Sequence, residues 1–68
     1  SKEKIYIYVP INKINSIKNK KIYINGKESN FKIAYVKKVA DDKFVTSYKV
    51  KLVGNYPTIS EVVKIDFK

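Results

Sequence analysis

The sequence predicts a mainly β fold: a small antiparallel β-barrel or rolled sheet of five or six strands with one short helical turn. Short runs rich in isoleucine, valine and tyrosine alternate with polar residues, as is typical of strands with one buried face. Glycine, proline, asparagine or aspartate separates these runs at intervals of roughly ten residues. The 68 residues have room for a single small domain, residues 1–68. Closure into a barrel would also remove exposed strand edges.

The first predicted strand covers Ile5–Val9. Isoleucine and valine occupy one phase of this run, whereas Tyr6 and Tyr8 occupy the other. A strand with one face in a core has this alternation. Pro10 ends the strand, because proline has no backbone N–H to donate to a sheet.

The next segment predicts a short α or 3₁₀ turn that closes one end of the core. Ile11, Ile14 and Ile17 recur at a spacing of three, which gathers them on one side of such a turn. Asn19 stands where a helix commonly ends in the left-handed conformation, which asparagine tolerates well. A second strand, Lys21–Ile24, repeats the alternation of isoleucine with tyrosine.

The middle of the chain contains two turn signals with a strand between them. Asn25-Gly26 is the strongest signal for a tight reversal. Apolar residues keep one phase from Phe31 to Tyr35 and then change phase, so we expect a bulge or a strand end near Lys37-Lys38. Residues 40–43, Ala-Asp-Asp-Lys, predict the next turn.

Two further strands complete the predicted fold. Phe44–Val53 alternates cleanly in its second half, the segment 54–57 breaks the chain, and a closing strand follows with its apolar residues at Val63, Ile65 and Phe67. The predicted core consists of Ile5, Ile7, Ile14, Ile17, Ile22, Ile24, Val50, Leu52, Val63 and Ile65.

The composition argues against catalysis. The chain contains no cysteine and no histidine, which removes thiolate ligands, the commonest general base and the commonest metal ligand. The six acidic residues are scattered, and the two glycines form no phosphate-binding loop. We therefore expect neither enzyme activity nor a cofactor, a metal or a small-molecule substrate. No run approaches the roughly 18 apolar residues of a membrane span.

The formal charge of +9 has two interpretations. An anionic partner, such as nucleic acid or a lipid headgroup surface, would be attracted to a protein with a pI near 9.8. However, all fifteen basic residues are lysine, whereas a protein that specifically binds phosphate groups or bases usually does so with arginine. Lys, Asn, Ile and Tyr together make 37 of the 68 residues, which an AT-rich coding sequence would produce regardless of function.

A candidate interaction surface combines tyrosines with a lysine cluster. Tyr6, Tyr8 and Tyr23 fall on the phase opposite the isoleucines and would form one aromatic patch if their strands pair. Such a patch can stack single-stranded bases or dock a protein, although tyrosine is also an ordinary resident of a half-buried sheet face. The lysine cluster, at the end of the predicted turn, consists of Lys18, Lys20 and Lys21.

The order of elements resembles the β-barrel domain of HlyD-like membrane fusion proteins, the periplasmic adaptor subunits that accompany ABC exporters. That domain opens with a strand ending near proline, a short helix with apolar residues at every third position, and a glycine before the next strand. The segments "IYIYVPINKINSI" and "KNKKIYI" are similar to these pieces, and Asn19 occupies the position of the family's glycine. "FKIAYVKKV", "KFVTSYKVKLV" and "PTISEVVKIDF" look like the strands that follow.

The resemblance implies a non-catalytic structural or docking module of a bacterial export system. Its partners would be a transporter subunit and neighbouring adaptor copies, outside the cytoplasmic membrane and close to its anionic surface. Membrane association would come from parts of a longer polypeptide. The alternative hypothesis is a small basic β-barrel, cytoplasmic, that binds nucleic acid through a face of lysine and tyrosine.

Overall fold

The chain is mainly β, as predicted, and its described residues form six strands and one short helical turn. The computed structural model describes residues 2–55 and 63–68. The elements in chain order are β1 (Lys2–Pro10), the 3₁₀ turn η1 (Ile14–Ser16), β2 (Ile22–Ile24), β3 (Lys27–Glu28), β4 (Lys32–Asp41), β5 (Phe44–Asn55) and β6 (Ile65–Phe67).

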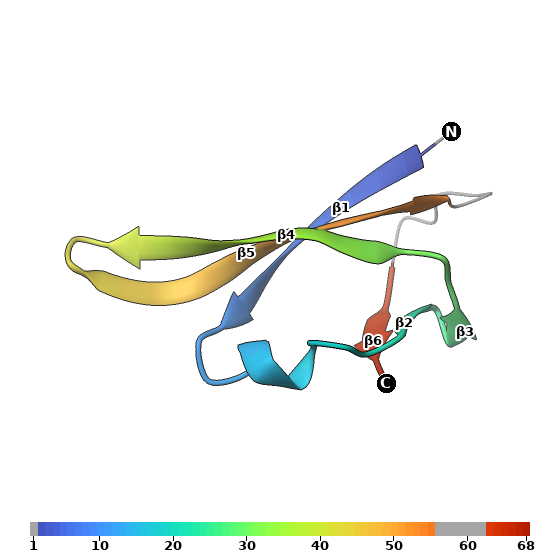
Figure 1. Cartoon of the computed structure of the whole chain (residues 1–68), viewed down its shortest axis with the longest axis horizontal. Coiled ribbons are helices and arrows are strands. Elements are labelled where there is room, and N and C mark those ends of the chain that lie inside the picture. Colours follow the sequence, from blue (N-terminus) through green and yellow to red (C-terminus); the bar gives the residue numbers. More distant parts are fainter. Residues whose placement is uncertain (1, 56–62) are drawn as a thin grey trace.

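The strands form two antiparallel sheets of three strands, with the orders β1-β5-β4 and β3-β2-β6. Figure 1 shows the long strands on one side of the molecule and η1 with the short strands on the other. A closed barrel does not form among the described strands. The reason is that β2, β3 and β6 pair with one another, so no described strand bridges from β1 to β4. The mainly β, antiparallel character of the prediction is confirmed, whereas its strands are divided between two small sheets.

The core lies between the two sheets and is closed by the 3₁₀ turn. Its buried residues are Val9, Ile14, Ile17, Ile22, Ile24, Phe31, Val50 and Leu52, with partly buried Ile5, Ile7, Ile33, Tyr48, Ile65 and Phe67 packed against them. Val50 and Leu52, in the central strand β5, are 0% exposed. Most of the predicted core is confirmed in this way.

Two predictions about apolar residues are wrong. Val63 is exposed, because β6 begins only at Ile65 and leaves Val63 before the paired segment. Ile11 is exposed as well, because it lies in the turn that precedes η1 and does not share the side occupied by Ile14 and Ile17.

Left-handed residues mark the turns. Asn19 has φ 59°, Asn25 has φ 51° and Gly26 has φ 83°, and the prediction of turns at these positions is confirmed. Positive φ at two consecutive central residues is the type I′ geometry that suits a tight hairpin, here between β2 and β3. Asp42, with φ 56°, makes the corresponding reversal between β4 and β5.

The predicted irregularity of β4 exists but lies elsewhere than Lys37-Lys38. The register against β5 shifts between Ile33 and Tyr35, which makes Ala34 an extra residue, and again between Val39 and Ala40. The bulge at Ala34 reverses the phase of the strand. Tyr35 consequently pairs with Lys51 on the face that points away from the core.

Backbone hydrogen bonds hold the closing strand. β6 pairs with β2, and Lys21 and Lys68 exchange N–H···O bonds of 2.8 and 2.9 Å just outside this pair. The Lys64 N–H donates to Asn25 Oδ1 at 2.8 Å, and the Asn25 N–H donates to the Lys64 carbonyl at 2.8 Å. The predicted break falls partly outside the described residues, because β5 continues to Asn55 and residues 56–57 lie beyond it.

Candidate interaction surfaces

The long sheet has an outer face of lysine and tyrosine. In the register of β1, β5 and β4, one row of this face is Tyr6, Lys51 and Tyr35, and the next row is Tyr8, Lys49 and Lys37. Lys4 precedes Tyr6 in the same phase of β1. We call this surface the Lys–Tyr face; its residues are Lys4, Tyr6, Tyr8, Tyr35, Lys37, Lys49 and Lys51.

Cation–π contacts order the centre of the Lys–Tyr face. The Lys49 ammonium lies 4.7 Å from the centroid of the Tyr6 ring, and the Lys51 ammonium lies 5.6 Å from that of Tyr35. Contacts of this length are attractive, and they hold two lysine side chains across the face instead of leaving them extended into solvent. Tyr8 remains 64% exposed. The face therefore presents an accessible ring beside two positioned charges.

The charge of this face is uniformly positive in the described part of the chain. Four lysines contribute to it, and the two rows of the register that contain Tyr6 and Tyr8 include no aspartate or glutamate. Glu3 on β1 has the opposite phase, since it alternates with Lys4. A surface of this kind attracts anions, and its exposed rings can stack on flat groups.

The predicted tyrosine patch is only partly correct. Tyr6 and Tyr8 lie together on the Lys–Tyr face, but Tyr23 does not join them, because β2 pairs with β3 and β6 instead of β1. Tyr23 is half-buried in the short sheet, where the Lys68 ammonium lies 5.0 Å from its ring centroid. Tyr35 takes the place expected for Tyr23. Sequence reasoning could have found it only by placing the bulge at Ala34.

The predicted lysine cluster lines a groove beside β4. Lys18, Lys20 and Lys21 stand on one side of this groove, which has a volume of about 620 Å³. Phe31, Ile33 and Val36 contribute apolar surface from the side of β4. We call this feature the β4 groove; its lining is Lys18, Asn19, Lys20, Lys21, Ile22, Glu28, Ser29, Phe31, Lys32, Ile33 and Val36.

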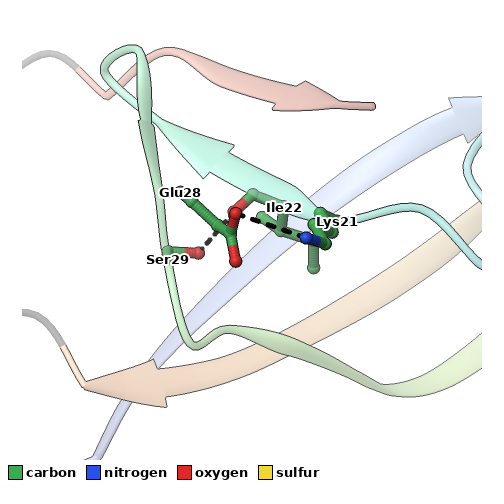
Figure 2. Close-up of polar contacts among 4 residues, drawn as sticks. All are labelled: Lys21, Ile22, Glu28 and Ser29. Atoms are coloured by element: carbon green, nitrogen blue, oxygen red, sulfur yellow. Dashed lines mark hydrogen bonds and ion pairs between the residues drawn. The ribbon is translucent and has the colours of Figure 1, made fainter.

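Local polar contacts fix the wall of the β4 groove opposite β4. Figure 2 shows the Ser29 hydroxyl donating to the Ile22 carbonyl at 2.7 Å and the Lys21 ammonium 3.6 Å from Glu28 Oε1. The same Ser29 Oγ accepts from the Phe31 N–H at 3.2 Å. Both side chains of the ion pair are more than half exposed, so Lys21 can also reach another carboxylate.

Comparisons with protein-family models, with characterised proteins and with solved structures find no significant match for this chain. Within residues 2–55 and 63–68, no three acidic, histidine or cysteine side chains gather as metal ligands. No helix in the same residues is long and apolar enough to cross a lipid bilayer. Arguments about function therefore depend on the two surfaces and on the order of the elements.

Proposed function

We propose that this chain is a non-catalytic docking module of a membrane-fusion adaptor in a bacterial export system. One observation carries the proposal: the left-handed φ of 59° at Asn19. Asn19 occupies the position where the HlyD-like pattern has a glycine, and a glycine there is explained by a backbone that needs positive φ. The same backbone requirement at the same place, between a 3₁₀ turn and β2, supports the resemblance beyond composition.

The surrounding elements add support. β1 ends at Pro10, η1 buries Ile14 and Ile17 under the sheet, and the final strand β6 pairs with β2. This is the order of pieces that the resemblance implies for the opening and the closing of the domain.

As a docking module the domain would act through its shape and its surfaces. The core between the sheets fixes the positions of the strands, so exposed side chains keep a constant arrangement. The strand edges and the β4 groove would contact the transporter subunit or neighbouring adaptor copies. The Lys–Tyr face would lie toward the anionic headgroups on the outer surface of the cytoplasmic membrane. Such headgroups attract each nearby lysine by about 1 kcal/mol.

The gene that encodes the chain provides the test. We expect the reading frame to contain a membrane anchor and a long helical hairpin, with an exporter gene beside it. Deletion of the codons for residues 1–68 should block export of the cargo while leaving the abundance of the transporter unchanged. Normal export after this deletion, or a reading frame without anchor and hairpin, would contradict the proposal.

A second candidate function is the binding of single-stranded nucleic acid. The Lys–Tyr face favours it, because exposed rings at Tyr8 and Tyr35 stand among lysines that can follow a phosphate backbone. Each stacked base would contribute about 1–3 kcal/mol. Log affinity should then fall with log salt by about 0.7 per phosphate contacted.

Tyrosine variants distinguish binding through base stacking from non-specific attraction of nucleic acid to the lysines. Replacing Tyr8 and Tyr35 by alanine should weaken binding of a fluorescent oligothymidylate by about 1–3 kcal/mol for each stacking ring lost. Tyr23→Ala is the matched control, because Tyr23 lies on the short sheet and should leave binding unchanged. Equal effects of all three changes, or binding abolished by modest salt, would exclude a dedicated nucleic-acid face.

A further inference from the structure

The outer edge of β4 is open within the described part of the chain. In the order β1-β5-β4 this strand pairs with β5 on one side only. An edge of this kind carries unpaired backbone N–H and C=O groups, which can accept a further strand. The bulge at Ala34 interrupts the edge, but the register is continuous from Tyr35 to Val39. This regular stretch is long enough to pair with a short extended segment.

The β4 groove lies alongside this edge and supplies apolar surface. Val36 is 41% exposed although it shares the phase of the fully buried Val50, and Ile33 is half-buried next to it. A strand added at the edge would turn alternate side chains toward this surface. Apolar residues at those positions would cover Val36, whose exposure is otherwise unfavourable.

The charge beside the edge selects the partner. Among the described residues that line the groove, Lys18, Lys20, Lys21 and Lys32 outnumber the one acidic residue, Glu28. On β4 itself, Lys37 and Lys38 are exposed and point to opposite faces of the strand. Lysines on an edge disfavour pairing with a second copy of the same strand, because like charges would come together, but they favour carboxylates.

We propose that β4 takes up an extended peptide segment with alternating apolar and acidic side chains, which adds a strand at the open edge and places its apolar residues over the β4 groove. The open backbone edge pairs with a peptide, and the exposed Val36 favours apolar side chains on the groove side. On the outer face, Lys37 at the edge with Lys49 behind it favours acidic side chains. The inference goes beyond the proposed function and does not depend on it, because it follows from the edge and the groove alone.

Within the described residues, β1 has the other open edge of the long sheet, but it lacks the features that argue for β4. No described groove residue comes from β1. Its apolar side chains Ile5, Ile7 and Val9 are partly or fully buried, so no equivalent of Val36 remains to be covered. A peptide that recognises only an open edge would bind β1 and β4 alike, which makes β1 the internal control.

The probe is a fluorescein-labelled synthetic peptide of alternating valine and glutamate, about nine residues long, the span of an ordinary strand. Fluorescence anisotropy with the whole chain at physiological salt should give saturable binding. A control peptide of the same length and charge, in which proline replaces each valine, cannot pair its backbone and should bind at least about tenfold more weakly. Equal affinity for the two peptides would overturn the added strand.

Charge-reversed variants locate the site. Lys37→Glu with Lys38→Glu should weaken binding of the valine–glutamate peptide by at least about tenfold. The same variant should bind a second labelled peptide, of alternating valine and lysine, that the original protein does not bind. Lys2→Glu with Lys4→Glu has the same net charge, changes β1 instead, and should alter the affinity less than about twofold. Circular dichroism checks that each variant is folded. Failure of the charge exchange, or a larger effect of the β1 pair, would contradict the proposal.

Two further measurements test the contact with Val36 and the pairing at the edge of β4. Val36→Lys places a charge over the groove and should reduce affinity at least about tenfold while leaving the exposed side of the strand intact. Amide hydrogen exchange in the presence of the peptide should slow from Tyr35 to Val39 and remain unchanged in β1. Protection confined to β1 would place the peptide on the wrong edge and overturn the inference.

Discussion

The two sheets are stabilised in different ways. The long sheet has strands of 9, 12 and 10 residues, and its central strand carries the two fully buried residues Val50 and Leu52. The short sheet has strands of 2 to 3 residues and is fastened by individual contacts, such as the reciprocal bonds of Asn25 with Lys64. Both sheets pack buried residues into the core, but the short strands depend more on individual hydrogen bonds than the long strands do. Substitutions in each sheet can test this difference.

The largest expected effect is in the core of the long sheet. Leu52→Ala removes a side chain that is 0% exposed and should lower the free energy of unfolding by about 2–5 kcal/mol. For a domain of this size, that change is comparable to the whole stability. Urea denaturation followed by circular dichroism measures it, with Lys51→Ala on the outer face as the control. A loss as small as that of the control would show that packing does not define the long sheet.

Gly54 should be the next most sensitive position. A Cβ at Gly54 would lie 2.6 Å from Phe31 Cγ and 2.8 Å from Phe31 Cα, so part of the clash is with backbone that cannot move aside. We expect Gly54→Ala to lower the free energy of unfolding by about 1–3 kcal/mol through overpacking.

Gly26→Asn is the control for the loss of a glycine. A Cβ at Gly26 would have no neighbour within 4 Å, so its substitution carries only the backbone strain of the φ of 83°, which asparagine accepts at lower cost than other side chains. Thermal denaturation should rank the two variants clearly. Equal losses would mean that the contact between Gly54 and Phe31 is looser than the distances indicate.

Asn25 should affect the short sheet selectively. Asn25→Gly keeps a residue that accepts positive φ but removes the oxygen that receives the Lys64 N–H, at an expected cost of about 0.5–1.5 kcal/mol. Amide hydrogen exchange should accelerate in β6 and stay constant in β5. Asn25→Asp retains the acceptor and should behave like the original protein. Equal acceleration of amide exchange in β5 and β6 would show that the bonds of Asn25 do not stabilise the short sheet selectively.

The smallest effect is expected at the ion pair on the wall of the β4 groove. Lys21 and Glu28 are 3.6 Å apart, and their side chains are 69% and 54% exposed, so solvent screens their attraction. Glu28→Gln should change the free energy of unfolding by less than about 1 kcal/mol. Chemical denaturation at low and high salt measures this change. A larger loss would mean that this contact also holds the short sheet together.

The sequence predicts the elements well where the pattern is local. Alternation identifies β1 and the second half of β5, the isoleucine spacing identifies η1, and asparagine with glycine identifies the left-handed turns. Each of these signals depends on residues that are neighbours in the chain. The conformational preferences that form a turn or a strand act between the same neighbours.

The pairing of strands is harder to predict, because it depends on distant residues. Tyr23 shares the pattern of Tyr6 and Tyr8, yet the strand that contains it pairs with β3 and β6. The alternation of Phe31, Ile33 and Tyr35 predicts that Tyr35 faces the core, which is wrong. The bulge at Ala34 that turns Tyr35 outward is recognised only from its pairing with β5. The Lys–Tyr face therefore combines two expected tyrosines with one that sequence patterns exclude.

Ala34 is a position where the chain can lose a residue without changing its surface. Ile33 lies opposite Leu52 and Tyr35 lies opposite Lys51, so deleting Ala34 would join them in an uninterrupted register. Tyr35 and Lys37 would keep facing outward, and Val36 would keep facing the core. Loss of this single codon would thus straighten the strand while preserving the chemical character of both of its faces.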